Sequence, residues 1–525
     1  MSLYVLIGSA LAIAAIISTR FAQRFGVPAL VLFVAIGMLA GSSGPGGIVF
    51  DDYALSLNVG LLALAVILLS GGLDMDVRVF QASLLPAGLL ATVGVVLKMG
   101  VIGGLAWLLT PLDLTSGLLL GAVLAPTDAA AVFSVLKGSG LPARLRGVLE
   151  TESGTNDPIS IYLTLLLTTI VTTGEAAFGP MIGGVVLQLA LGAALGYGFG
   201  RALVVLINRV RIDSFGLYPM LALAGGLLAY AATDLLGGNG FLAIYVVGIV
   251  LGNRPLTHRQ NIRHFMDAMA WGAQIVMFLL LGLLVFPDQL VPHLPTALLL
   301  TAGLILLARP LSVALTLAPL GLFGTRYRFN VREQALLSWA GLKGAVPIIL
   351  AIIPLLNAVP NSLFIFNVTF VCVVIGAALQ GLSIVPLAHR LGLTEDEPPE
   401  PPLRIELAGA APPGSAVLDV FLDESAPAVG QRLADLDLPR RVVVAAIYRD
   451  GTLIAPRGQV VFRAGDHVYL ISEDADAERL PPAFATAPSG DGARAAQRRP
   501  GAWEHGSTGA QGVETRTRRN EEPRQ

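Results

Sequence analysis

The sequence has little charge and almost no cysteine. Charged residues make up 13% of its 525 residues and hydrophobic residues 54%, whereas soluble domains carry about 25% charged residues. Cys372 is the single cysteine, which excludes an intrachain disulfide and a multi-cysteine metal site, and we expect it to be a small core residue. The net charge of −2 comes with no basic or aromatic pattern typical of nucleic-acid binding. With a mean hydropathy of +0.73, the composition indicates a polytopic membrane protein.

Long apolar runs fill most of the chain up to residue 390. Runs of about 17–25 residues predict about thirteen transmembrane helices. No basic residue precedes the first run, so we expect an uncleaved span rather than a signal peptide. The predicted spans lie near residues 3–19, 26–42, 54–73, 84–109, 115–137, 146–171, 178–206, 217–233, 239–252, 267–286, 295–320, 331–356 and 362–388.

The loops between these spans alternate in charge. Basic residues such as Arg20, Arg78 and Arg209 follow the odd-numbered spans, whereas acidic residues such as Asp51 and Asp113 follow the even-numbered ones. The positive-inside rule therefore predicts a multi-pass protein of the cell inner (plasma) membrane, with its N-terminus outside and its C-terminus in the cytoplasm.

The composition changes after the last span. We predict a transmembrane domain over residues 1–390, an acidic, proline-rich linker over 391–403, a small cytoplasmic α/β domain over 404–486 and a disordered tail over 487–525.

Three stretches of the small domain predict its elements. "RRVVVAAIYRDGTLIAP" reads as two strands that turn at Asp450 and Gly451. "VVFRAGDHVYLIS" predicts further strands, and "AVGQRLADLDLP" predicts a short helix.

Three polar stretches interrupt the predicted membrane spans. Charge inside a membrane is costly and by default marks a functional site, with a purely structural ion-pair network as the alternative. Lys98, deep in the fourth span, either pairs with an acidic core residue or reaches a water-filled crevice. The stretches are "LAPTDAAAVF", with Thr127 and Asp128, "ETESGTNDPIS", with Glu152, Ser153, Asn156 and Asp157, and "WAGLKGAVPIIL", with Lys343.

Proline and glycine in two of these stretches predict broken helices. Pro126 and Pro347 each lack a backbone donor, while Gly341 and Gly344 loosen the backbone. The two spans are the fifth and the twelfth, which correspond if spans one to six repeat in inverted form as spans eight to thirteen. Paired interrupted helices in corresponding positions indicate the binding site of a transporter.

The motifs "APTDAAAVFSVL", "ESGTNDP" and "GLKGAVPI" together resemble the bacterial monovalent cation:proton antiporters of the sodium/proton exchanger superfamily. Within it, the chain is most similar to the potassium/proton antiporters of the NhaP type. The C-terminal segment, with "VVVAAIYRDG" and "AGDHVYLIS", resembles the C-terminal subdomain of potassium-conductance regulator (RCK, or TrkA-C) domains. The resemblance implies a homodimer with a mobile core built on crossed broken helices.

The same resemblance implies the role of each polar residue. It identifies Asp157 as the carboxylate that binds cation or proton, and Asn156 as the residue that orients it. Thr127, Asp128, Ser153 and Glu152 complete the cation site. The family usually has arginine at this position, whereas this chain has Lys343. Lysine keeps the charge but loses the fork of donors. We expect Lys343 to compensate the broken-helix ends together with a carboxylate, either Glu152 or Asp128.

These observations predict a secondary transporter and not an enzyme. We expect electroneutral exchange of K⁺, or alternatively Na⁺, for H⁺, with no cofactor, no nucleic-acid partner and a possible small regulatory ligand on the C-terminal domain. A regulated cation channel is the rival hypothesis, although "TVG" at 92–94 lacks the Tyr-Gly of a potassium filter. An intramembrane aspartyl protease is disfavoured because both Gly-Asp pairs of the chain, at 465–466 and 490–491, lie after the predicted spans.

Overall fold

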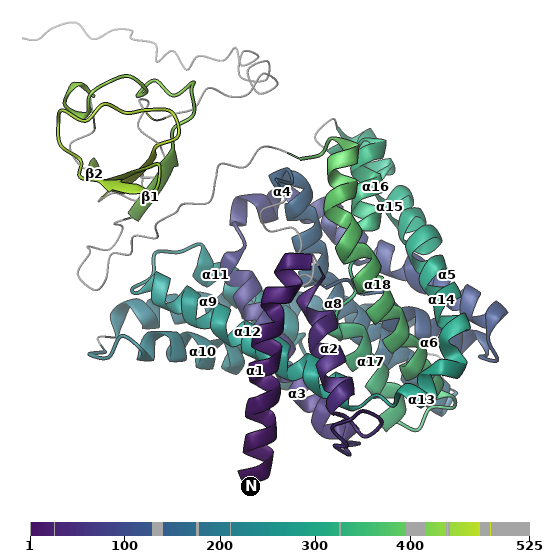
Figure 1. Ribbon diagram of the computed structural model, residues 1–525. Coiled ribbons are helices and arrows are strands. Elements are labelled where there is room, and N and C mark those ends of the chain that lie inside the picture. The colour runs from purple at the N-terminus through teal and green to yellow at the C-terminus, as the bar shows by residue number, and fades with distance from the viewer. Residues whose placement is uncertain are drawn as a thin grey trace, which may run out of the picture. The chain divides into compact units, whose positions relative to one another are not determined.

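The computed structural model (Figure 1) describes residues 2–25, 27–128, 140–174, 178–210, 212–324, 327–394, 416–436, 438, 442–472 and 484. The chain divides into two compact units, Met1–Pro398 and Pro399–Gln525. Most of the predicted linker and the whole of the predicted tail lie outside the described residues.

The first unit is helical, and every predicted span contains at least one helix. Short 3₁₀ turns follow α13 and α15, and the π-helix η2 (Leu304–Ala308) joins α14 to α15. The helices are α1 (Ser2–Phe25), α2 (Ala29–Ala40), α3 (Tyr53–Asp74), α4 (Val77–Ala91), α5 (Val93–Leu109), α6 (Leu114–Leu124), α8 (Ala143–Thr173), α9 (Phe178–Arg209), α10 (Leu217–Leu235), α11 (Gly240–Gly252), α12 (Arg259–Leu283), α13 (Pro287–Leu290), α14 (Leu294–Gly303), α15 (Arg309–Leu317), α16 (Val331–Trp339), α17 (Ala345–Leu356) and α18 (Ser362–Leu391).

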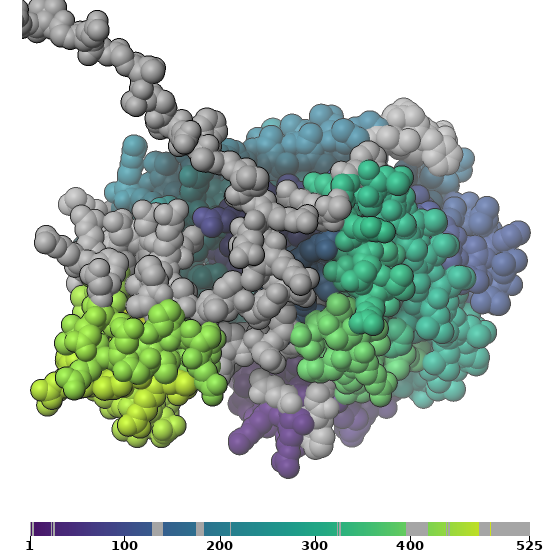
Figure 2. Space-filling view, turned by 90° about the horizontal axis from the view of Figure 1, so that it is seen from above, coloured from purple at the N-terminus to yellow at the C-terminus, as the bar shows by residue number. Residues whose placement is uncertain are grey.

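Among the described residues, seven helical segments are long and apolar enough to cross a membrane, and α2, α6, α11 and α17 are shorter apolar helices. The total of thirteen crossings stays a prediction. Cys372 is buried in the apolar core of this unit, as predicted. Seen from above in Figure 2, the teal-to-green residues of α15, α16 and α18 are grouped on one side of the unit.

Two helices begin seven and eight residues before their predicted spans. The span predicted from residue 84 starts at Val77, where Asp76 caps α4 by accepting from the Arg78 amide. The span predicted from residue 267 starts at Arg259. In both places a polar first turn precedes the apolar run. Hydropathy marks only the part of a helix that suits lipid, so it places such helix starts too late.

Both predicted helix breaks are present. α6 ends at Leu124, and Ala125–Asp128 is not helical. Residues 340–344 separate α16 from α17. Pro347 does not itself cause the second break, because it lies in the first turn of α17, where helix amides have no intrahelical acceptor.

The second unit contains a four-stranded antiparallel sheet in the order β1-β4-β2-β3. Asp450 and Gly451 both have positive φ, which confirms the predicted hairpin between β2 and β3. The predicted helix is a single 3₁₀ turn, Leu433–Asp435, and the predicted strand before β4 is reduced to one bridge between Arg432 and Val461. The strands are β1 (Ala416–Phe421), β2 (Val442–Arg449), β3 (Thr452–Ile454) and β4 (His467–Ser472).

Candidate functional site

The two helix breaks lie against each other in the interior of the first unit. The Asp128 amide donates to the Leu342 carbonyl at 2.9 Å. Lys343 Nζ donates to the carbonyls of Pro126 at 2.6 Å and Ala125 at 3.2 Å. These carbonyls follow the C-terminus of α6, where helix carbonyls lack acceptor partners and the dipole favours a cation. Lys343 therefore makes the contacts that the predicted compensation of a broken helix end requires.

Gly344 allows the second break to approach the first this closely. A Cβ on Gly344 would overlap the carboxyl group of Asp128. Any side chain at 344 would therefore displace either Asp128 or the backbone of the crossing.

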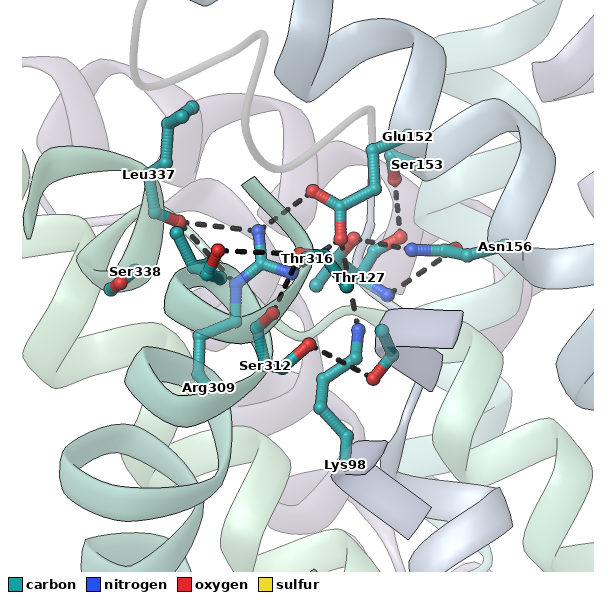
Figure 3. Close-up of polar contacts among 12 residues, drawn as sticks. Lys98, Thr127, Glu152, Ser153, Asn156, Arg309, Ser312, Thr316, Leu337 and Ser338 are labelled. Carbon is teal, nitrogen blue, oxygen red and sulfur yellow. Dashed lines mark hydrogen bonds and ion pairs between the residues drawn. The ribbon is translucent and has the colours of Figure 1, made fainter. Parts of the chain in front are cut away.

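Two residues of α8 fix Thr127 in the first break (Figure 3). The Asn156 amide Nδ2 donates to Thr127 Oγ1 at 2.7 Å, and Asn156 Oδ1 accepts from the Thr127 amide at 3.5 Å. The Ser153 hydroxyl donates to the Thr127 carbonyl. The structure thus brings together Thr127, Ser153 and Asn156, three of the predicted site residues. Both polar atoms of the Asn156 side chain bond to Thr127.

Asp157 follows Asn156 in α8 and is 3% exposed. Its Oδ1 has no hydrogen-bond partner within the described part of the chain. Asp128 and Lys343 both lie close enough to Asp157 to interact with it electrostatically. A buried carboxylate oxygen without a donor is unfavourable, so this position favours uptake of either a proton or a cation.

Glu152 lies in the same helix but is held by other partners. Its Oε1 pairs with Arg309 Nη1, and its Oε2 accepts from Arg309 Nη2 at 2.7 Å (Figure 3). Lys98 Nζ lies 3.7 Å from Glu152 Oε1. All three side chains are at most 3% exposed. The structure therefore pairs Glu152 with Arg309 and Lys98, and of the two expectations for Lys98 it supports the acidic core partner.

Arg309 is the residue that the sequence interpretation missed. It begins α15 directly after η2, and its Nε and Nη2 also donate to the Leu337 carbonyl at the end of α16. The signal was present, because "LILLARPLSV" places an arginine inside an apolar run. The rule that marks Lys98 marks Arg309 as well.

No group of three or more His, Cys, Asp or Glu side chains in the described ranges is placed to hold a metal ion together. The neighbouring polar groups are instead oxygens, namely the carboxylate of Asp128, which acts on Asp157, and the hydroxyl and carbonyl of Thr127, which contact Asn156 and Ser153. Hard oxygen donors of this kind suit a weakly held alkali ion as cargo better than a tightly held transition metal.

Comparison with known proteins gives two family matches. The family described as sodium/hydrogen exchanger, transmembrane, matches residues 10–390, and the TrkA-C domain family matches residues 417–484.

Several known proteins and solved structures resemble the chain over most of its length. The K⁺/H⁺ antiporter NhaP2 of Shewanella sp. (strain ANA-3) is 41% identical over 490 residues, covering 92% of this chain and 84% of the relative. The K⁺/H⁺ antiporter NhaP of Alkalimonas amylolytica is 38% identical, covering 93% and 84%. The sodium proton antiporter MjNhaP1 of Methanocaldococcus jannaschii, solved at pH 8, shares the fold with a TM-score of 0.63 and 23% identity, over 74% of this chain and 99% of that one.

Proposed function

This chain belongs to the sodium/hydrogen exchanger family, and from that premise we propose that it exchanges K⁺ for H⁺ one for one at Asp157. Exchange of a monovalent cation for a proton is the activity of the family and of the relatives that match most of the chain. We assign the protein transport and no catalysed chemical reaction.

The observation that carries the proposal is that Asp157 is buried while one of its carboxylate oxygens lacks a hydrogen-bond partner among the described residues. Its Oδ1 lacks a hydrogen-bond donor among the described residues, although the side chain is buried beside the crossed breaks. Such a carboxylate holds a proton or a dehydrated cation, but not both. If the loaded site faces each side of the membrane in turn, competition between the two ions produces exchange.

The charges around the site support an electroneutral cycle. Lys98, Arg309 and Lys343 balance Glu152, Asp128 and Asp157 when all six are ionised. Binding of either K⁺ or H⁺ then adds one positive charge, so the two loaded states carry equal charge. Asn156 stands where a second carboxylate would take up another ion.

Potassium is favoured over sodium by two observations. The relatives that cover most of the chain are named K⁺/H⁺ antiporters, and the C-terminal unit matches the TrkA-C family. We propose that this unit lies in the cytoplasm, where a small regulatory ligand binds it, and that the protein is a homodimer with its N-terminus outside the cell membrane.

The test is a fluorescence-dequenching assay in everted vesicles that contain the protein, with K⁺, Na⁺ and Li⁺ supplied across a range of pH. We expect K⁺ to release the imposed proton gradient at lower concentration than Na⁺. Preference for Na⁺ would replace the potassium assignment, and single-channel currents in planar bilayers would replace exchange by a channel.

A further inference from the structure

A second buried carboxylate lies on the same face of α8 as Asp157 and takes no part in the site described above. Glu150 is 8% exposed and makes no hydrogen bond or ion pair with any residue that the structure describes. Residues 150, 154 and 157 follow the i, i+4, i+7 pattern that places side chains along one stripe of a helix. Glu150 therefore precedes Asp157 along one face, toward the start of α8.

A second unpaired polar group lies between the two carboxylates. Tyr245, on α11, is 3% exposed, and its hydroxyl has no hydrogen-bond partner within the described ranges. A Cβ at Gly154 would lie 2.6 Å from Tyr245 Cζ and 2.9 Å from its hydroxyl oxygen. The absence of a side chain at 154 thus lets this hydroxyl reach the face of α8 that carries Glu150 and Asp157.

Two neighbouring helices and two charged side chains surround this stripe. α4 and α11 both pack on α8, and Phe80 of α4 meets the Tyr245 ring edge-on at 6.4 Å between centroids. The charges that act on Glu150 are Arg146, one turn earlier in α8, and Asp74, at the end of α3. Asp74 is itself paired with Arg263 at 3.0 Å.

We propose that Glu150 and the Tyr245 hydroxyl form a second position for the transported monovalent cation, on the cytoplasmic path to Asp157. A buried carboxylate and a buried hydroxyl, neither with a hydrogen-bond partner among the described residues, are the hard oxygen ligands that an alkali ion takes in place of water. The proposal rests on the proposed exchange and on the cytoplasmic placement of the start of α8.

The test measures K⁺/H⁺ exchange from each face separately, in everted and in right-side-out vesicles. Glu150→Gln keeps the shape of the side chain and removes its charge. We expect it to raise the apparent KM for K⁺ about tenfold when K⁺ is supplied at the cytoplasmic face, which corresponds to about 1.4 kcal/mol. The rate at saturating K⁺ and the KM at the outer face stay close to those of the unchanged protein.

Glu333→Gln is the matched control. Glu333 pairs with Arg144 at 3.5 Å near the start of α16 and belongs to a capping box, which glutamine also satisfies. It removes one carboxylate away from the α8 stripe, so its KM values should equal those of the unchanged protein on both faces. A rise in KM equal to that of Glu150→Gln would make the effect one of general charge and overturn the proposal.

Tyr245→Phe provides an independent arm, because it keeps the ring against Gly154 and Phe80 and removes only the hydroxyl. We expect a smaller rise in cytoplasmic KM, and a double variant with Glu150→Gln that falls short of the product of the two single effects. Unchanged KM in both single variants, or equal rises on both faces, would overturn the proposal. If the unchanged protein exchanged no ions, the proposed function itself would fail, whereas normal exchange with unaffected variants would remove only this position.

Discussion

Two turns of α8 contain two buried carboxylates with opposite surroundings. Glu152 is bound by the Arg309 guanidinium and lies 3.7 Å from Lys98, whereas Asp157 Oδ1 has no hydrogen-bond partner in the described part of the chain. Burial alone therefore does not identify the exchanging group. The supply of hydrogen-bond donors distinguishes Asp157 from Glu152, because a carboxylate already paired with a guanidinium gains little from binding an ion.

The largest expected effect comes from replacing Asp157, the carboxylate with an unpartnered Oδ1 in the described part of the chain. Asp157→Asn should abolish K⁺-driven proton movement and leave the melting temperature unchanged or higher, because it removes an unpaired buried charge. Asp157→Glu should keep some activity with altered apparent affinity. Dequenching in everted vesicles and thermal melting of the purified protein measure both effects, and substantial exchange by folded Asp157→Asn would contradict the proposed mechanism.

Removing Arg309, the partner of Glu152, tests the other carboxylate of the comparison. Arg309→Ala leaves Glu152 with Lys98 alone, and breaking a buried pair costs about 3–5 kcal/mol. We expect a clearly lower melting temperature together with lost exchange. The double variant Arg309→Ala/Glu152→Gln should recover part of the stability, and an equal loss in single and double variants would show that the pair itself contributes little.

Which parts of the site could be predicted depends on how far apart in the sequence the contacting residues lie. Thr127, Ser153, Asn156 and Asp157 could be placed in one site because their motifs mark them locally and the broken helices join them. The pairing of Glu152 with Arg309 could not, because the two residues lie 157 positions apart along the chain and meet only in the folded structure. The helix breaks followed from glycine and proline, but the polar first turns of α4 and α12 have no apolar signal.

Lys343 should give an intermediate effect. Lys343→Ala leaves the Ala125 and Pro126 carbonyls without their donor, and each buried unsatisfied group costs about 1–3 kcal/mol. We expect lower melting temperature and lower activity, with Lys343→Arg well tolerated as the control. If alanine leaves melting unchanged yet abolishes transport, or if arginine abolishes proton coupling, Lys343 is itself part of the proton cycle.

Lys98 sharpens the question of charge. Exchange in proteoliposomes should be insensitive to an imposed membrane potential, since one positive charge moves each way. Lys98→Met makes the site more negative and should lower the apparent KM for K⁺ a few-fold without adding sensitivity to the potential. If the rate of the protein without substitutions depended on the membrane potential and the rate of Lys98→Met did not, Lys98 would be a second carrier of charge.

The smallest effect is expected in the C-terminal unit. Burial raises the pKa of Asp419 above its usual value, and the hydrogen bond with His467, at 3.2 Å, offsets this in part. An acid whose pKa is raised on folding favours the folded state at low pH, and this contribution is lost as pH rises through the folded pKa. Protection of the β1 and β4 amides from hydrogen exchange, corrected for the intrinsic pH dependence of amide exchange, should therefore fall slightly as the pH rises through the folded pKa of Asp419. Asp419→Asn should remove the pH dependence, and unchanged dependence would assign it to another group.

The crossing of the two breaks has a mechanical consequence. Hydrogen bonds from the Asp128 amide and from Lys343 Nζ join the two non-helical segments of the crossing. Asn156 and Ser153 bind Thr127 to α8. We therefore expect these segments to move as one body, so that an ion moving relative to the membrane takes the whole crossing with it. A covalent staple inside the crossing should then leave turnover intact, whereas a staple between α8 and α11 should stop it.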